Sequence, residues 1–192
     1  MGLAYYILDT ETTGVKAGWH EVVEISIIRC SDRHQLTRFI KAEYPERADE
    51  RALMVTGKSI PDLMNGDSKE DVIGMCERFF DQDGLTPSHR CIIGHNVSFD
   101  KRFCHAMWES VGRVFPAVCW LDTLKVSKEW AKKIGRKPDN FQLSTLLKFA
   151  DVKLQNVHSA EGDTRNLYIF WKKHLSKLNT VSMIKREPHL VK

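Results

Sequence analysis

Five short segments rich in apolar or β-branched residues limit the folds that this chain can adopt. They cover residues 3–9, 22–30, 34–42, 90–96 and 118–123, and their length and composition are typical of strands. Apolar residues recur at helical spacing over 68–82, 99–112, 123–134, 142–150 and 159–178. Three strands followed by an alternation of strands and helices predict an α/β sandwich with a five-stranded mixed sheet flanked by helices.

The size of the chain fits a single domain. With 192 residues, 42% of them hydrophobic, it can bury a substantial core unaided. We expect one domain over residues 1–180 and a loose tail over 181–192, where helical periodicity is lost. No segment has the apolar length that crosses a bilayer, and no secretory signal begins the chain. We therefore expect a cytoplasmic protein with no membrane partner.

The charged residues are distributed unevenly along the chain. Residues 1–124 carry 14 Lys and Arg against 19 Asp and Glu, a balance of −5, whereas residues 125–192 carry 15 against 6, a balance of +9. The acidic part would repel phosphates unless metal ions lie among its carboxylates. The basic part suits a polyanion such as nucleic acid, although solvated helix surfaces carry such charges too. The pairs that we expect to guide a strand are Lys132/Lys133, Arg136/Lys137 and Lys172/Lys173.

Two acids separated by one residue lie at the end of the first strand segment, Asp9 as its last residue and Glu11 just beyond it. In an extended chain, residues i and i+2 point to the same side, so Asp9 and Glu11 present their carboxylates together. Such a pair is common on solvated loops, but the carboxyl ends of strands in α/β sheets are also where ligands bind. Two anions held this close repel each other unless a cation or a proton relieves them. The pair is therefore a candidate metal site.

Two further acids lie near predicted helix starts. Asp100 ends the segment GHNVSFD, which follows another strand, and Asp163 lies five residues after His158 near the start of the last helix. An acid at a helix start can serve simply as a cap that complements the helix dipole. Capping alone does not explain the histidines and the aromatic residue that accompany these acids.

Together, three segments resemble the motifs of the DEDDh, or DnaQ-like, 3′→5′ exonucleases. They read D-x-E-T-T-G at 9–14, H-N-x-x-F-D at 95–100 and H-x-A-x-x-D at 158–163, in the family's order, and the similarity extends over roughly residues 5–170. The resemblance implies a ribonuclease H-like three-layer sandwich. It also implies four acids that hold two Mg²⁺ or Mn²⁺ ions and a histidine that acts as general base. In this sequence these residues are Asp9, Glu11, Asp100, Asp163 and His158.

The resemblance further implies residues that hold the end of a nucleic-acid strand. The first motif's turn would offer backbone N–H groups to the terminal hydroxyl and phosphate, and Phe99 could stack on a base or pack under its helix. Thr56 lies in Thr56-Gly57-Lys58-Ser59, where many members read His-Gly-Ile-Thr. The full set of candidates is Thr12, Thr13, Gly14, Thr56, Asn96 and Phe99. Two other acids are expected to be structural and outside the metal set, Glu24 and Asp122.

These features predict a metal-dependent exonuclease that degrades single-stranded or frayed DNA from the 3′ end and releases 5′-mononucleotides. The Thr-Thr-Gly of the first motif is more similar to proofreading exonucleases of replicative DNA polymerases than to oligoribonucleases, which usually carry Met-Thr-Gly. An RNA-trimming exoribonuclease is the alternative, because no residue visibly reads the 2′-hydroxyl. An inactive module that binds nucleic acid or a polymerase is a weaker alternative, because all four acids and the histidine are present. The sequence leaves open whether a polymerase or a repair protein is a partner.

Overall fold

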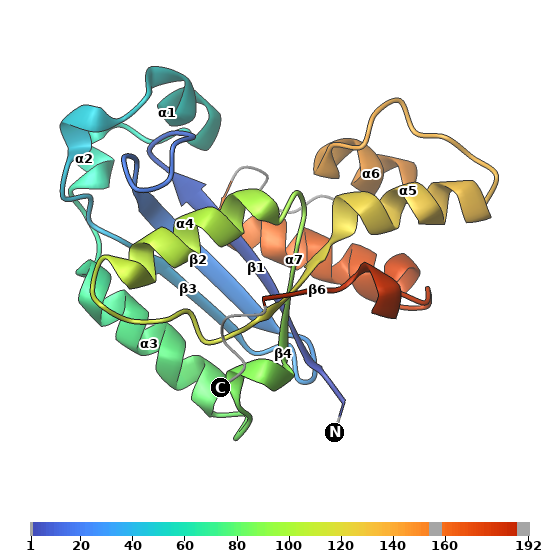
Figure 1. Cartoon of the computed structure of the whole chain (residues 1–192). Helices are drawn as coiled ribbons and strands as arrows, with labels where there is room; N and C mark the ends of the chain where they lie inside the picture. The colour runs from blue at the N-terminus through green and yellow to red at the C-terminus, as the bar shows by residue number, and fades with distance from the viewer. Residues whose placement is uncertain (1, 154–158, 188–192) are drawn as a thin grey trace.

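The computed structural model describes residues 2–153 and 159–187, which form a mixed sheet with helices on both faces (Figure 1). The strands are β1 Ala4–Thr12, β2 Val22–Arg29, β3 Gln35–Phe39, β4 Arg90–Gly94, β5 Cys119–Asp122 and β6 Lys185–Arg186. They lie in the order β3-β2-β1-β4-β5-β6. β1 pairs antiparallel with β2 and parallel with β4, so the strand that carries the first two acids lies inside the sheet.

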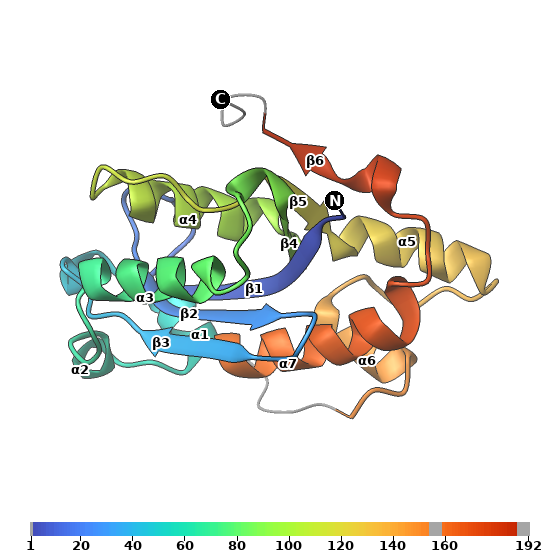
Figure 2. The same ribbon diagram turned by 90° about the horizontal axis from the view of Figure 1, so that it is seen from below.

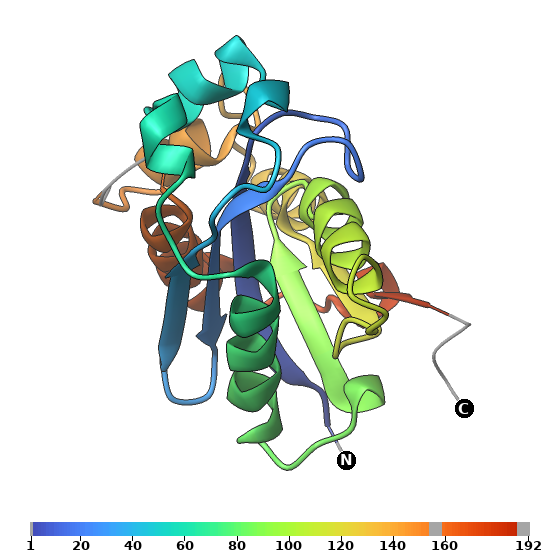
Figure 3. The ribbon, with the colours of Figure 1, turned by 90° about the vertical axis from the view of Figure 1, so that its left-hand side faces the viewer.

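Two layers of helices cover the sheet (Figures 2 and 3). Helices α3 (Lys69–Asp81) and α4 (Ser98–Glu109) pack on one face, whereas α5 (Thr123–Lys133), α6 (Leu143–Phe149) and α7 (Ala160–Phe170) pack on the other. β1 supplies Tyr6 and Leu8 to the first core and Ile7 to the second, because neighbouring side chains of a strand point to opposite faces. The sheet is therefore buried on both sides.

Several short elements complete the chain. Helices α1 (Glu50–Thr56) and α2 (Ile60–Leu63) project beyond the end of β1, as Figure 3 shows. The remaining turns are η1 Pro45–Arg47, η2 Pro87–His89, η4 Val181–Met183 and the π-helical turn η3 Trp171–Leu175, which follows α7. Among the described residues, no helix combines the length and the apolar composition needed to span a bilayer.

The three-layer α/β architecture predicted from the sequence is confirmed, but the sheet has six strands rather than five. The sixth strand is only two residues long and lies in the segment expected to form a loose tail. It pairs antiparallel with β5, and the N–H of Glu187 donates to the carbonyl of Val118 at 3.0 Å. The Glu187 carboxylate also pairs with Lys101 and His105 of α4. Two residues are too few to give a periodicity signal, so hydropathy could not reveal this strand.

The first strand is also longer than predicted. It was expected to end at Asp9, but it continues through Thr12, with a bulge between Glu11 and Thr12 where the pairing register with β2 shifts. Asp9 therefore lies within the strand, and Glu11 is its next-to-last residue. Their polar character hid the extension, because these side chains serve the site described below instead of an apolar core.

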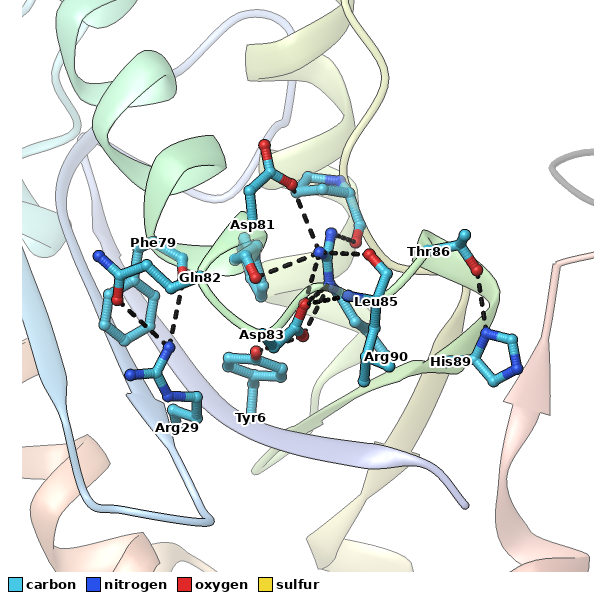
Figure 4. A network of polar contacts seen from close by, with 12 residues as sticks. Tyr6, Arg29, Phe79, Asp81, Gln82, Asp83, Leu85, Thr86, His89 and Arg90 are labelled. Carbon is cyan, nitrogen blue, oxygen red and sulfur yellow. Dashed lines mark hydrogen bonds and ion pairs between the residues drawn. The ribbon is translucent and has the colours of Figure 1, made fainter. Parts of the chain in front are cut away.

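A buried arginine, Arg90, links several elements at the end of the sheet where β4 begins (Figure 4). The side chain of Arg90, at the start of β4, is 1% exposed and lies 2.8 Å from a carboxylate oxygen of Asp83. It also donates to the carbonyls of Phe80 and Leu85, at 3.1 and 2.6 Å. Tyr6 of β1 donates its hydroxyl to the same Asp83 carboxylate at 2.6 Å. The network thereby links β1, β4 and the end of α3.

The electrostatics of Asp83 make it a stabilising group at neutral pH. Burial raises the pKa of this carboxyl, but hydrogen bonds from Arg90, Tyr6 and the N–H of Leu85 outweigh burial, so its pKa lies below the usual 3.8. A lowered pKa in the folded state means that the ionised form stabilises the fold above the unfolded pKa. This contribution is lost as the pH falls through the lowered value.

We expect Asp83→Asn to destabilise the domain strongly, because it leaves the buried Arg90 charge without its main partner. Breaking such a pair costs about 3–5 kcal/mol, or about 6–20 °C in Tm for a chain of this size. The matched control is Asp81→Asn, since Asp81 lies 3.4 Å from the same guanidinium but its side chain is 72% exposed. Thermal unfolding should show a loss of under about 1 kcal/mol for the control. Equal losses in the two variants would contradict the assignment.

Candidate active site

β1 presents two carboxylates to one side of the sheet. Asp9 lies opposite Ser26 of β2 in register, and Glu11 lies opposite Glu24. Between them, Thr10 points to the other side, where its backbone N–H and hydroxyl both bind Asp100 of α4. The alternation of one strand therefore directs three consecutive residues to two different helices.

The third carboxylate comes from α7. Ser159 caps this helix by accepting the N–H of Gly162 at 3.1 Å, and the hydroxyl of Thr164 hydrogen-bonds with that of Ser26 at 2.9 Å. These contacts fix the first turn of the helix, which carries Asp163, against β2. Carboxylate oxygens of Asp9, Glu11 and Asp163 all lie within 4.8 Å of one another. The structure thus brings together three of the four predicted metal-binding acids.

The fourth predicted acid, Asp100, lies beside this group rather than within it. Its carboxylate is buried and accepts the N–H and the hydroxyl of Thr10 through the same oxygen, Oδ1, at 3.0 and 2.8 Å. Electrostatically it belongs to the site, because its charge raises the pKa of Asp9. The fifth predicted residue, His158, lies outside the described residues.

The clustering of acids changes their protonation. Burial raises the pKa of Asp9 well above its usual value, and the charges of Asp100, Glu11 and Asp163 raise it further. Burial, followed by the neighbouring carboxylates, raises the pKa of Glu11 to about 7, and burial raises the pKa of Asp100 to about 7 although Thr10 opposes the shift. The ionised forms are unfavourable together without a cation. The donor set is therefore suited to a hard divalent ion, which prefers oxygen ligands.

The two acids expected to lie outside the metal set have their own partners. Glu24 is buried, forms an ion pair with Lys58 at 3.0 Å and accepts the N–H of Glu161 at 3.3 Å. Asp122 caps α5 by accepting the N–H of Leu124 at 3.1 Å, and it also accepts the N–H of Asn96. Both side chains are thus accounted for by structural contacts.

Sequence reasoning missed the part played by Lys58. The charge of Lys58 lowers the pKa of Glu11, so this lysine partly compensates the acidic cluster as well as pairing with Glu24. The sequence feature that could have indicated this role is the difference between residues 56–59 and the usual sequence of the family. Many family members carry an apolar residue at the position of Lys58. Its consequence depended on the fold of the α1–α2 segment, which the sequence did not reveal.

The second motif mixes structural and exposed side chains. The ring of His95 is held by contacts of its two nitrogens, 3.0 Å from the Thr123 hydroxyl and 2.8 Å from the Phe141 carbonyl. Asn96 is exposed and has a left-handed backbone, with φ of 61°. Phe99 is half-buried, with its ring centroid 4.8 Å from that of Phe103. Phe99 therefore packs partly against the core, and its exposed surface leaves room for a stacked base.

The remaining substrate-binding candidates shape the loop after β1. Thr12 donates its hydroxyl to the carbonyl of Gly14 at 2.6 Å, and the hydroxyl of Thr13 accepts the N–H of Glu21 at 2.9 Å. A Cβ on Gly14 would lie 2.6 Å from the ring of His20, so any larger residue there would force this ring to move. Thr56 donates its hydroxyl to the carbonyl of Ala52, one turn earlier in α1. Their contacts with a substrate stay predictions.

A three-layer sandwich in which acids of a central strand and of the flanking helices come together defines a ribonuclease H-like nuclease. Residues 6–170 match the exonuclease (RNase T) family, and the chain belongs to this family. It is 26% identical over 172 residues to the PolC-type DNA polymerase III of Latilactobacillus sakei, an alignment that covers 88% of this chain and 11% of the relative. The chain therefore spans about a tenth of that relative's length.

Solved structures support the fold. The crystal structure of cell-death related nuclease 4 (CRN-4) has a TM-score of 0.73 at 13% identity, and the match covers 89% of this chain and 63% of that one. The zinc-bound form of the Escherichia coli ExoI complex with single-stranded DNA has a TM-score of 0.74 at 17% identity, covering 90% and 40%. At these identities the likeness establishes the architecture.

We expect the metal-free protein to lose stability as the pH rises towards 7. The pKa of Glu11 is about 7 in the folded state against 4.5 ordinarily, so the protonated carboxyl stabilises the fold below about pH 4.5 and this contribution is lost as the pH climbs to 7. Asp9→Asn removes one of the repelling charges and should raise Tm at pH 8 in EDTA by about 3–5 °C, the equivalent of one pKa unit. Asp122→Asn keeps an oxygen that can cap α5, so its Tm should change little. A lowered Tm in Asp9→Asn would refute the repulsion.

Binding of a divalent ion should weaken at acidic pH, because protons compete for the same oxygens. With the pKa values of Glu11 and Asp100 both at about 7, the apparent affinity for Mn²⁺ should fall by about 10-fold from pH 8 to pH 6 for each carboxyl that must lose a proton. Titration calorimetry in two buffers of different ionisation enthalpy would measure the released protons. Binding at pH 6 as tight as at pH 8, with no proton release, would rule out these carboxylates as ligands.

Proposed function

We propose that the protein is a metal-dependent 3′→5′ exonuclease that removes 5′-mononucleotides from single-stranded or frayed DNA ends. The observation that carries the proposal is the convergence of carboxylate oxygens of Asp9, Glu11 and Asp163 within 4.8 Å on two rigid elements. Membership of the exonuclease family gives the reaction class. The PolC-type polymerase and the ExoI complex with single-stranded DNA support DNA as the substrate.

The carboxylates are proposed to hold two Mg²⁺ or Mn²⁺ ions. Asp9, Glu11 and Asp163 would bind one ion, and Asp100 would help Asp9 to hold the second. When bound, such ions supply an activated water molecule and stabilise the charge on the leaving 3′-oxygen. The raised pKa values of Asp9 and Glu11 fit this assignment, because burial and the neighbouring carboxylates outweigh the opposing charge of Lys58 at Glu11.

The protein's own groups orient the substrate and move a proton. His158 is the proposed general base, which takes the proton from the attacking water. The rigid loop over Thr12, Thr13 and Gly14 is proposed to hold the terminal sugar and phosphate through backbone N–H groups. The exposed part of the Phe99 ring would stack on a base without selecting its sequence, and Asn96 and Thr56 would border the strand.

Activity should depend on the acidic cluster. Asp163→Asn removes one ligand with almost no change in volume, so we expect a loss of at least about 10²-fold in turnover with a normal fold. Asp122→Asn is the matched control, because its carboxylate caps α5 and should be dispensable for chemistry. The assay is hydrolysis of 5′-labelled DNA and RNA oligonucleotides of the same sequence with Mg²⁺ or Mn²⁺. Stepwise shortening from the 3′ end and its loss in EDTA are the expected results.

The outcomes of this assay separate the alternatives. Faster shortening of RNA than of DNA would favour an RNA-trimming enzyme. Binding of either strand without any hydrolysis would favour a nucleic-acid-binding or polymerase-binding module. Full turnover by Asp163→Asn would refute the metal site. Copurification with a polymerase would test the partner suggested by the PolC-type relative.

The pH dependence should reveal the general base. A histidine base acts in its neutral form, so the rate at saturating Mg²⁺ should rise with pH through its pKa and then level off. His158→Ala should slow the chemical step by about 10²- to 10⁴-fold and flatten the rise. Saturating metal matters, because the acids titrate in the same range when the site is not filled. An unchanged profile in the variant would assign the base to another group.

A further inference from the structure

An open basic groove runs along α5. It has a volume of about 610 Å³ and is lined by residues of α5 and of the segment 134–142. This segment leads from α5 towards α6 (Figure 1). Phe141 and Met183 supply its apolar lining, and lysines of α5 stand along one side. We call it the α5 groove and define it by Lys125, Lys128, Lys132, Arg136, Phe141 and Met183.

The charge of the groove is strongly positive. Its lining contains five cations, the four named above and Lys137, against a single acid, Glu129, which leaves a balance of +4. Glu129 already pairs with Lys132, at 2.7 Å. The lysines of α5 recur every three or four residues, at 125, 128 and 132, so they form a row on one face of the helix.

Aromatic rings lie directly beneath two of the cations. The Lys128 ammonium is 5.7 Å from the ring centroid of Phe141, and the Arg136 guanidinium is 4.7 Å from that of Phe149. Phe141 is half-buried and lines the groove. A cationic row beside an aromatic face is the combination that binds single-stranded nucleic acid, because phosphates meet the cations and bases stack on the ring.

The groove is connected by hydrogen-bonding contacts to the second motif, which carries Asp100. The carbonyl of Phe141 lies 2.8 Å from His95 Nε2, and the other nitrogen of that ring meets Thr123, the first residue of α5. His95 precedes Asp100 by five residues in the second motif. One end of the groove therefore adjoins the segment that carries an acid of the site, and Lys125 lies in the first turn of α5.

A second basic hollow, near the end of α7, is a weaker candidate. Its arginines are already engaged: Arg33 donates to the hydroxyl of Tyr168 at 3.1 Å, and Arg165 pairs with Glu161 and binds Gln35. Tyr168 is buried, so no ring is available for stacking there. Of the two basic hollows, the α5 groove therefore offers the better combination of charge and aromatic surface.

We propose that the α5 groove binds the single-stranded part of the nucleic-acid substrate that precedes its 3′ end. The inference rests on the proposed function, because it takes the strand's end to be at the acidic cluster. The groove is a second binding region, distinct from the acids, and it contacts phosphates and bases without reading sequence. An acidic, amphipathic peptide has similar chemistry, but the connection of the groove to the second motif favours the strand.

The test is the double variant Lys128→Gln/Arg136→Gln, with Arg78→Gln/Lys177→Gln as a matched control. Both variants remove one Lys and one Arg charge, and the control residues are exposed and outside the groove. Fluorescence anisotropy of a labelled 20-nucleotide oligo-dT, in EDTA over a salt series, would measure affinity. For two lost phosphate contacts, the slope of log K against log[salt] should fall by about 1.4 and the affinity at 0.1 M salt by roughly 10- to 30-fold. The control should change less than about 2-fold.

A second variant tests the aromatic surface. Phe141→Leu keeps an apolar side chain and the backbone carbonyl that His95 meets, but it cannot stack, so affinity should fall by at least about 5-fold. Thermal unfolding of each variant would exclude misfolding as the cause.

Binding in EDTA needs no hydrolysis, so the groove is tested even if the exonuclease assignment fails. If the double variant keeps the salt slope and the affinity of the wild type and degrades DNA normally, the groove does not bind the strand. The proposed exonuclease function would then be unaffected. Loss of binding to an amphipathic Glu/Leu peptide with unchanged oligonucleotide binding would assign the groove to a protein partner instead. An equal loss in the control variant would mean that only the overall charge matters and would likewise overturn the proposal.

Discussion

The mutual repulsion of carboxylates is the constraint on which the arrangement of this protein depends. Three acids have oxygens within 4.8 Å of one another, and a fourth adds its charge from α4. A flexible loop would relieve such repulsion by moving apart. Here two of the acids are on β1, between β2 and β4, and the third is on a helix whose cap and Thr164–Ser26 contact prevent withdrawal. The fold therefore holds these carboxylates in an arrangement that is unfavourable without a cation, and a bound cation would stabilise it.

The strand alternation explains how one segment serves both faces of the sheet. Asp9 and Glu11 face α7, whereas Thr10 holds Asp100 of α4 through two hydrogen bonds. Each helical layer therefore contributes one acid, Asp163 or Asp100, beside the same strand. The Glu24–Lys58 pair extends this arrangement to the α1–α2 segment, because it places a positive charge beside Glu11.

The sequence predicted the features that depend on local patterns. Apolar segments predicted the five longer strands, and the helical spacing over 68–82 predicted α3, which spans Lys69–Asp81 and is capped where the N–H of Asp71 donates to the Ser68 hydroxyl. The three motifs predicted which acids would meet, and the structure places three of them together. Features that depend on pairing between distant residues could not be predicted. β6 has no hydropathy signal, the extension of β1 is polar, and the role of Lys58 required knowing that it reaches Glu24.

The short strand β6 has a consequence for how the protein behaves in a crowded solution. The outer edge of β5 carries backbone N–H and C=O groups that would otherwise be open to pairing with a second chain. Lys185 and Arg186 cover part of this edge, and both are charged and exposed, which discourages any further strand from adding beyond them. Two residues thereby terminate the sheet. A chain cut before Lys185 would keep its acids and its helices, but the edge of β5 would have unpaired backbone N–H and C=O groups. Two copies of the chain could then pair edge to edge through these groups.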